Sequence, residues 1–469
     1  MTRASLWVVV IGVAVMGCGD DDGGGSGSIA TTETLRAELA AATPGQTLTL
    51  AAGTFEGPFD VPAGVTLLGA GRDQTRIHAA AEQIALRVRG GAGRTVLRAL
   101  TVVSDGRAGV LAIGADELEL AEVTVTCTGP GVAIGVEDTA LVVANDVAVT
   151  GPVMRADPTA AEALAASGFV LVDVGRAQLG NVTARAFVDS GLTAIRTALE
   201  WTGGGVSDGL GQGISVFGGS ATLTDLRVAD QIRFAVGVQR STYGIAATGG
   251  AMLDTEGVTV EGIDGFGLYH GEATALHTVL DVSGGTNTSV LLERGADVTI
   301  RGATISDGLF AAIAAVGASQ LVVEDAMLEG IGEATRPSDT FGAVTVGDGI
   351  HVVESETEQR LANLRLERVV LADNARVGFL ADLGGMGSTS VLSFADVVVR
   401  GPESGYGALA QNGEIAEGWD TGLVREGALS TRDVGAPSMD TAPPLRAGDL
   451  PAFPGSDDDG IAGIIGPID

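Results

Sequence analysis

The feature that most limits what this chain can fold into is a repeated pattern of short apolar runs separated by tight turns. Residues 101–127 hold three such runs, Thr101–Val103, Gly109–Ile113 and Leu118–Val125, and the dividers between them are of turn length. A similar arrangement returns at residues 303–327. Since no divider is long enough for a crossover helix, we expect the chain to wind as a solenoid with three strands and three turns in each coil.

The start of the body carries a more specific signal. A short helix is predicted over Thr34–Ala42, with Leu35 and Leu39 on one face, and it is followed by PGQTLTLAAGTFEGPFDVPAGVTLLGAGRDQTRI at residues 44–77. This helix and motif resemble the opening of right-handed parallel β-helix proteins of the pectin-lyase-like superfamily. The resemblance implies an all-β, right-handed parallel β-helix solenoid over residues 34–413, with the short N-terminal helix capping its open apolar end.

The spacing of aliphatic residues gives the length of one coil. Leucines in a comparable frame, with one valine, recur about every 22 or 23 residues or at a multiple of that spacing, which is a solenoid period. The series is Leu118, Leu141, Leu179, Leu223, Leu253, Val298 and Leu321. Longer gaps predict insertions, the first at Pro152–Ser167, read as a loop with a short helix, and two more at Glu329–Gly347 and near Glu354–Gln359.

The N-terminus predicts export and lipidation. Arg3 precedes an apolar stretch, Leu6–Met16, which is short for a membrane span and ends at Gly17-Cys18. This looks like a bacterial lipoprotein signal: residues 1–17 would be removed and Cys18 would anchor the protein to a membrane. An ordinary secretory signal is the alternative. Residues 18–33 then form a flexible tether, and the glycine after Cys18 favours the outer membrane of the bacterial cell envelope.

Charge excludes one class of partner. The formal net charge is −32 and the chain has no lysine, which argues against nucleic acid, since phosphate binding needs clustered basic side chains. The second cysteine, Cys127, lies in a strand pattern and is expected to be a buried, inert thiol. Residues 414–435 are predicted to cover the C-terminal edge of the solenoid. Residues 436–469 are acidic and rich in proline, which predicts an extended, largely disordered tail.

Asp-Gly pairs recur at what is expected to be the same turn of several coils. The five aspartates are Asp105, Asp208, Asp264, Asp307 and Asp348. They can be read as ordinary turn residues, because aspartate bonds its own backbone and glycine accepts positive φ. They can also be read as a row of carboxylates able to hold Ca²⁺, with Asp208, Asp264, Asp307 and Asp348 as candidate ligands. The sequence leaves both readings open.

The densest group of chemically active side chains is at residues 263–273, IDGFGLYHGEA. Asp264, Tyr269, His270 and Glu272 are candidate catalytic residues, since a carboxylate, a phenol and an imidazole suit proton transfer at a sugar. The alternative is a surface turn with unrelated polar groups. The motifs of pectin methylesterases, polygalacturonases, pectate lyases and mannuronan epimerases are not recognisable in the chain.

These observations together favour a non-catalytic envelope lipoprotein, a β-helix rod that binds a glycan or a partner protein. Two alternatives stay open. The first is a polysaccharide lyase or glycosidase, which would need acidic and basic groups from adjacent coils around a sugar-sized groove. The second is a purely structural envelope protein, which a face without exposed aromatic side chains would favour.

Overall fold

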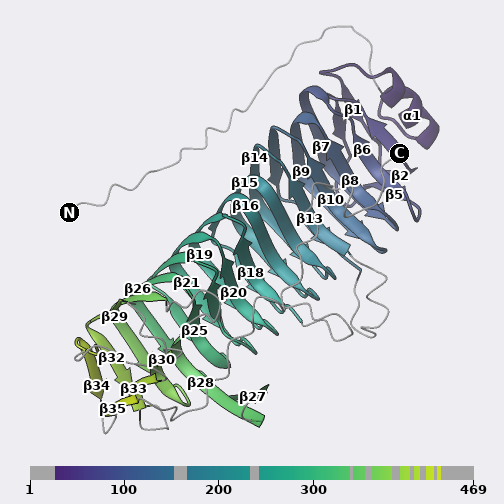
Figure 1. Cartoon of the computed structure of the whole chain (residues 1–469). Helices are drawn as coiled ribbons and strands as arrows, with labels where there is room; N and C mark the ends of the chain where they lie inside the picture. Colours follow the sequence, from purple (N-terminus) through teal and green to yellow (C-terminus); the bar gives the residue numbers. More distant parts are fainter. Residues whose placement is uncertain are drawn as a thin grey trace, which may run out of the picture.

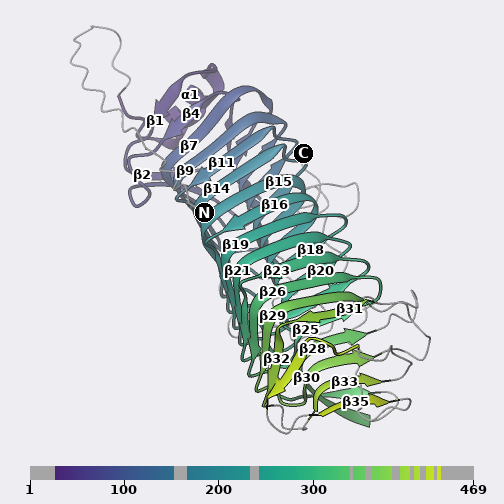
Figure 2. The same cartoon turned by 90° about the vertical axis from the view of Figure 1, so that its left-hand side faces the viewer.

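The computed structural model describes residues 27–152, 166–232, 242–338, 342–353, 362–382, 391–401, 406–411, 419–426 and 430–434. Within these ranges the chain forms a rod of stacked strands with a single helix at its N-terminal end (Figures 1 and 2). Nearly all the strand pairs are parallel, and most strands pair with strands of the coils before and after them. The predicted all-β, right-handed parallel β-helix is confirmed.

The strand pairs form three ladders that run the length of the rod, which matches the predicted three strands per coil. Ladder A contains β3 (Phe59–Val61), β6 (Ile84–Val88), β8 (Ala108–Ile113), β10 (Gly131–Glu137), β13 (Ala166–Val172), the starts of β15 (Ser190–Ser207) and β16 (Gln212–Thr224), β18 (Tyr243–Thr248), β20 (Phe266–Gly271), β22 (Val290–Glu293), β25 (Phe310–Val316), β28 (Gly342–Val353), β30 (Val377–Asp382), β33 (Tyr406–Gln411) and β35 (Ser430–Val434).

Ladder B contains β1 (Thr47–Thr49), β4 (Thr66–Leu68), the first parts of β7 (Gly91–Ser104) and β9 (Ala115–Cys127), β11 (Leu141–Asn145), the first part of β14 (Arg176–Arg185), later parts of β15 and β16, the first parts of β19 (Met252–Glu261) and β21 (Thr274–Ser283), β23 (Asp297–Arg301), the first parts of β26 (Gln320–Glu329) and β29 (Asn363–Ala372), and β31 (Leu392–Ala395).

Ladder C contains β2 (Gly53–Glu56), β5 (Thr75–Ala79), the ends of β7 and β9, β12 (Ala148–Thr150), the ends of β14 and β15, β17 (Arg227–Ala229), the ends of β19 and β21, β24 (Thr304–Ser306), the ends of β26 and β29, β32 (Val397–Arg400) and β34 (Leu423–Glu426).

Helix α1 (Thr32–Ala41) lies at the N-terminal end of the rod, as predicted, with slightly different bounds. Its N-cap is Thr31, whose hydroxyl accepts a hydrogen bond from the backbone N–H of Thr34. Leu35 and Leu39 are buried in the same core as the first coils, and the guanidinium of Arg36 donates to the carbonyl oxygens of residues 56–58. The helix therefore covers apolar side chains that the first coil would otherwise expose.

The interior is filled by columns of aliphatic side chains, one from each coil. Leu118, Leu253, Val298 and Leu321 lie in one such column of ladder B, as their spacing predicts. Three assignments to this series are wrong. Val142 pairs with Leu118, and Leu141 points outward. Leu179 and Leu223 are buried, but they lie two residues further along their strands, in the next inward column. A slip of one residue reverses the side of a strand, so spacing alone placed the coil correctly but not the side chain.

Two of the predicted insertions can be located within the described ranges. The first falls between β12 and β13, although most of Pro152–Ser167 lies outside the described residues. The second, Glu329–Gly347, contains β27 (Ala334–Ser338), which pairs antiparallel with the start of β28 and leaves the rod as a hairpin (Figure 1). Residues 354–361, where the third is predicted, are outside the described ranges.

The C-terminal end differs from the prediction in one respect. The coils do not stop at residue 413, because β34 extends ladder C and β35 extends ladder A, with Trp419 and Leu423 buried in the main core. The signal peptide, Cys18 and most of the tether fall outside the described residues, as does the acidic tail from residue 436. The end of the predicted tether, residues 18–33, is part of the folded body: Ile29 is buried in the core and pairs with Leu50, and helix α1 begins at Thr32. In the described part of the chain, no helix has the length and apolar character needed to span a membrane.

Candidate functional site

The strand β20 separates the side chains that the sequence grouped together. Tyr269 and His270 are neighbours in this strand, so they point to opposite sides of ladder A. Tyr269 packs with an outer cluster, while His270 points into the rod. Asp264 lies in the turn before β20, and Glu272 lies exposed after it with a φ of 55°. The predicted site of Asp264, Tyr269, His270 and Glu272 is therefore not one constellation.

On the inner side, His270 of ladder A meets His277 of ladder B. Their Nε2 atoms are 3.1 Å apart, and His277 Nδ1 is 2.8 Å from the hydroxyl of Thr255. Both imidazoles are fully buried, and burial lowers the pKa of His270 well below its usual value and that of His277 to about 4. This is a neutral, structural hydrogen-bonded pair without access to solvent.

On the outer side, Tyr269 belongs to an aromatic group on ladder A. The ring of Tyr243 stacks on Phe266 at 5.6 Å and lies 5.1 Å from Tyr269. The hydroxyl of Tyr269 donates to Glu293 Oε1 at 2.5 Å, and burial together with this carboxylate raises the pKa of the phenol. Tyr269 is thus held protonated by its surroundings and does not supply a phenolate.

Four of the five Asp-Gly aspartates lie between a strand of ladder C and the next strand of ladder A, as the turn reading predicts. Asp105 accepts from Thr128, Asp208 pairs with Arg185, and Asp264 accepts from Thr286. Asp307 has a φ of 51°, the left-handed conformation of a turn. Among the described residues, no group of three or more His, Cys, Asp or Glu side chains is arranged to hold a metal ion.

Asp348 is the exception, because it lies inside strand β28 and not at the predicted turn. Its side chain is fully buried on the outer side of ladder A, and it accepts two hydrogen bonds from Arg376, at 2.7 and 2.5 Å. Such a bidentate pair supplies charge-assisted hydrogen bonds to a carboxylate that water does not reach. Asp348 is therefore part of a local charged cluster and not part of a row of turn carboxylates.

His351 completes this cluster, and sequence reasoning missed it. It follows Asp348 by three residues, is fully buried, and has its Nδ1 3.4 Å from Asp348 Oδ2, which is long for a hydrogen bond. Neither ring nitrogen has a hydrogen-bond partner. Burial lowers the pKa of His351 despite the nearby carboxylates of Asp348 and Asp382. The available signal was GDGIHVV at residues 347–353, where an apolar strand carries two ionisable groups.

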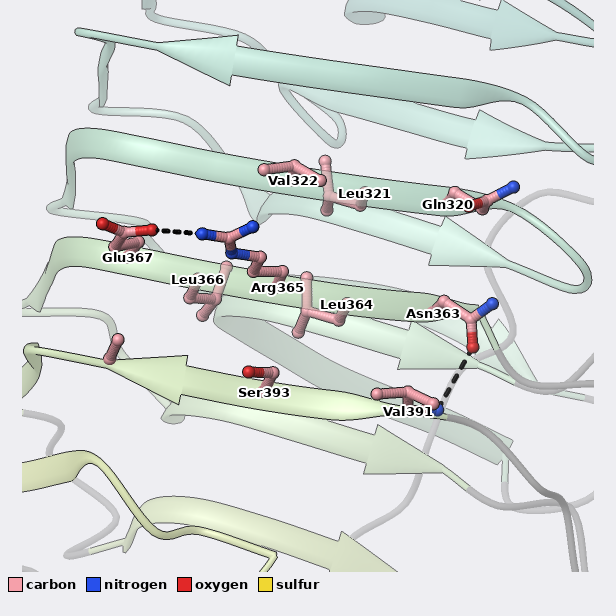
Figure 3. Close-up of a pocket in the computed structure, with 11 residues that line it drawn as sticks. Gln320, Leu321, Val322, Asn363, Leu364, Arg365, Leu366, Glu367, Val391 and Ser393 are labelled. Atoms are coloured by element: carbon pink, nitrogen blue, oxygen red, sulfur yellow. Dashed lines mark hydrogen bonds and ion pairs between the residues drawn. The ribbon is translucent and has the colours of Figure 1, made fainter.

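A second candidate surface lies on the outside of ladder B, where a shallow groove of about 540 Å³ crosses β26, β29 and β31 (Figure 3). Arg365 lies in its middle and pairs with Glu367 at 2.6 Å, and Asn363 accepts from the backbone N–H of Val391. Ser393 and Gln320 add a hydroxyl and an amide. The groove exists because short side chains on β31 stand beside long ones on β29. It is open, and among its mostly apolar walls it carries several groups able to form hydrogen bonds.

Neither the outer face of ladder A nor that of ladder B presents an exposed aromatic side chain among the described residues. Of the aromatic side chains that the structure describes, none is exposed, and Phe217 is the most accessible at half-buried. The exposed large apolar residues are aliphatic and scattered: Ile232, Met252, Val279, Val391 and Val424. Ring stacking on an exposed aromatic face is thus not a feature of the described surface. This is the observation that the purely structural alternative predicts, so a glycan would have to bind through hydrogen bonds in the groove.

Comparison with known proteins gives likeness of fold only. No protein-family model and no curated protein matches the chain. Solved structures similar to it include the A-module of mannuronan C-5 epimerase AlgE6 from Azotobacter vinelandii, at 16% identity and a TM-score of 0.44 over 84% of this chain and 94% of that one. A GH87 α-1,3-glucanase catalytic domain has 10% identity and a TM-score of 0.45, covering 88% and 70%. Tailspike protein 3 of bacteriophage CBA120 has 12% identity and a TM-score of 0.40, covering 93% and 63%.

Proposed function

We propose that this protein is a non-catalytic envelope lipoprotein whose rod binds a glycan in the ladder B groove. The observation that carries the proposal is the groove itself, in which outward polar side chains of three successive coils lie side by side (Figure 3). A chain lying along the rod meets a new strand about every 4.8 Å, so a repeating polymer would find repeated hydrogen-bonding groups. The amides, hydroxyl and guanidinium of the groove suit sugar hydroxyls and carboxylates.

A glycan array probed with the protein, in the presence and absence of calcium, tests this function. We expect binding to one class of polymer that falls at least about tenfold when Arg365→Ala and Asn363→Ala are combined. Arg176→Ala is the matched control, because Arg176 is also an outward arginine of ladder B paired with a glutamate, Glu200, but lies far along the rod. Equal binding by both variants would contradict the groove as the site.

The lipid anchor is a separate part of the proposal. Its support is the signal-like sequence ending at Cys18, followed by a tether rich in glycine and aspartate. Growth with a labelled fatty acid should label the wild-type protein, and Cys18→Ser should abolish the label and release the protein from membranes. A labelled Cys18→Ser variant would contradict lipidation at this position.

A second candidate function, polysaccharide cleavage, is favoured by the cluster on ladder A. Asp348, Arg376 and His351 come from neighbouring coils, and a buried imidazole with unpartnered nitrogens beside a carboxylate is a candidate acid or base. Incubation with a panel of polysaccharides tests it: cleavage that is lost in His351→Ala and kept in Asp264→Ala would establish catalysis. No cleavage by the wild-type protein of any polymer that it binds would favour the non-catalytic function.

A further inference from the structure

The outer side of ladder A carries a continuous column of buried side chains. The register links one residue of each coil from β8 to β33 in a single line. The column runs through Leu111, Gly135, Val170, Thr193, Ser215, Ala246, Tyr269, Leu291, Ala314, His351, Leu380 and Leu409. Each non-glycine member is less than 9% exposed, and several are fully buried. Something therefore covers this outer face along most of the rod.

The described elements do not provide that cover. Helix α1 packs against β2 and β3, and the hairpin strand β27 packs on β28. The strands of ladder A otherwise contact adjacent coils and the other ladders. Outward side chains such as Leu111, Val170 and Ile195 form a cluster separate from the main core, so their burial does not come from the interior. The cover must come from a part of the chain outside the described ranges or from another molecule.

The connections near β8 and β10 are too short to supply it. Only residues 105–107 separate β7 from β8, and residues 128–130 separate β9 from β10. On the other edge, only Gly114 separates β8 from β9, and residues 138–140 link β10 to β11. Yet Leu111 and Val132 on these strands are 1% and 0% exposed. The nearest long connection is the one between β12 and β13, in the coil after β10.

We infer that the C-terminal segment, residues 435–469, folds back along the outer face of ladder A and covers it. The last described residue, Val434, ends β35, which is itself a strand of ladder A at the C-terminal end of the rod. The return path to β8 crosses a dozen coil steps, roughly 60 Å, and the 35 residues of the segment extend to about 110 Å. The segment starts in the right place and is long enough.

Its composition also suits the face. The segment has six prolines, which favour extended chain, and its far end holds Ile461, Ile464, Ile465 and Ile468. A chain returning from β35 would bring this end to the coils around Leu111 and Val170. Apolar side chains meeting an apolar face exclude water from both. The same cover would lie over Tyr269 and His351, which belong to the same column.

The test uses the full chain with a protease recognition sequence inserted between Val434 and Gly435, so that the body folds with the segment attached. After cleavage, we expect the fragment to stay with the body in size-exclusion chromatography. Its removal by repeated dilution should increase the fluorescence of a dye that binds apolar surfaces. Fluorescently labelled fragment added back should then rebind and reverse the increase.

Two pairs of variants locate the contact. Val170→Asp on ladder A should weaken rebinding at least about tenfold, while Val143→Asp, outward on ladder B and half-buried, should leave it unchanged. Because Val170→Asp can impair folding, Ile464→Asp in the fragment is the second variant, with the same loss expected and Ser438→Asp as its control. These fragment variants leave the body untouched.

Other results would overturn the inference. A fragment that separates at once without a rise in dye binding would mean that the face is covered by another segment. Dye binding that rises only when residues 1–26 are removed would assign the cover to the N-terminus. A dimer that dissociates as the dye binds would assign it to a second copy of the chain. Loss of glycan binding alone would bear on ladder B and not on this inference.

Discussion

Ladders A and B have the same backbone arrangement and opposite outer faces. The outward residues of ladder A, such as Leu111 and Val170, are about 1% exposed, whereas the equivalent outward residues of ladder B, such as Val143 and Gln178, are half-buried. Both ladders stack with the same coil period and fill the same interior core. The comparison teaches that the inward side chains of both ladders form the core that determines the fold. The outward side chains differ in their surroundings: those of ladder B contact solvent, and those of ladder A lie under a cover.

Because the two outer faces differ in exposure, an ion pair on ladder A has a different energetic cost from one on ladder B. On ladder B, an arginine paired with a glutamate of the next coil, as Arg301 with Glu324, is a solvated pair and needs no further explanation. On ladder A, Asp348 and Arg376 lie where apolar side chains predominate, and a buried ion pair is costly to form. Charge on ladder A is therefore the better pointer to a catalytic group, whereas the open groove proposed to bind a glycan lies on ladder B.

The largest expected effect is loss of the buried pair. Arg376→Ala leaves the Asp348 carboxylate buried without its partner, which should lower the free energy of unfolding by about 3–5 kcal/mol. Arg301→Ala on ladder B should lower it by less than about 1 kcal/mol. Denaturant unfolding of both variants measures the difference. A small loss for Arg376→Ala would mean that water reaches Asp348 and would break the comparison.

A matched pair of leucines tests the apolar part of the two faces. Leu111→Ala removes an outward side chain that is 1% exposed on ladder A, and we expect a loss of about 2–4 kcal/mol. Leu141→Ala removes an outward side chain of ladder B that already meets solvent, so the loss should stay below about 1 kcal/mol. Thermal and denaturant unfolding measure both, and equal losses would contradict a covered face.

These positions also mark the limit of what sequence could predict. Strand-length runs, turn residues and the opening motif predicted the coils, the capping helix and the position of the hairpin insertion, because each depends on local chemistry. Alternation within β20 could have separated Tyr269 from His270, but which side faces the interior depends on the coil register. His351 was missed because its burial and its contact with Asp348 depend on neighbouring coils. The predicted lipid anchor and acidic tail remain predictions.

The pKa values of the histidines are a third measure of burial, with a smaller expected effect on stability. Burial lowers the pKa of His270, His277 and His351, while bonds to Glu56 and then Asp105 raise that of His78. Above about pH 6.5 the buried histidines are neutral in both the folded and the unfolded chain and contribute no pH dependence. Below it the unfolded chain binds protons that the folded chain cannot, so the free energy of unfolding falls, by up to about 1.4 kcal/mol per pH unit for each buried histidine.

His78 has the opposite sign. Its raised pKa means that the folded chain gains its proton first, so its small stabilising effect is present at acidic pH and is lost as pH rises through its folded pKa. The chain has four histidines, so NMR titration can assign all of them. We expect His78 to titrate above about pH 6.5 and the other three below it. A His351 that titrates at its ordinary value with the C-terminal segment in place would show that ladder A is open to solvent.

The smallest expected effect is the response of the two arginine substitutions to salt. Screening weakens interactions between exposed charges and acts much less on buried pairs. The cost of Arg301→Ala should therefore fall from a few tenths of a kcal/mol toward zero as NaCl rises from about 0.02 to 0.5 M. The cost of Arg376→Ala should not change, because the Asp348 carboxylate is fully buried. Each variant is compared with the wild-type protein at the same salt concentration. Salt also screens the overall negative charge, but this affects all three proteins nearly equally, so it cancels in the difference in free energy of unfolding. If the two costs fell together, the outer faces of ladders A and B would have to be equally accessible to ions.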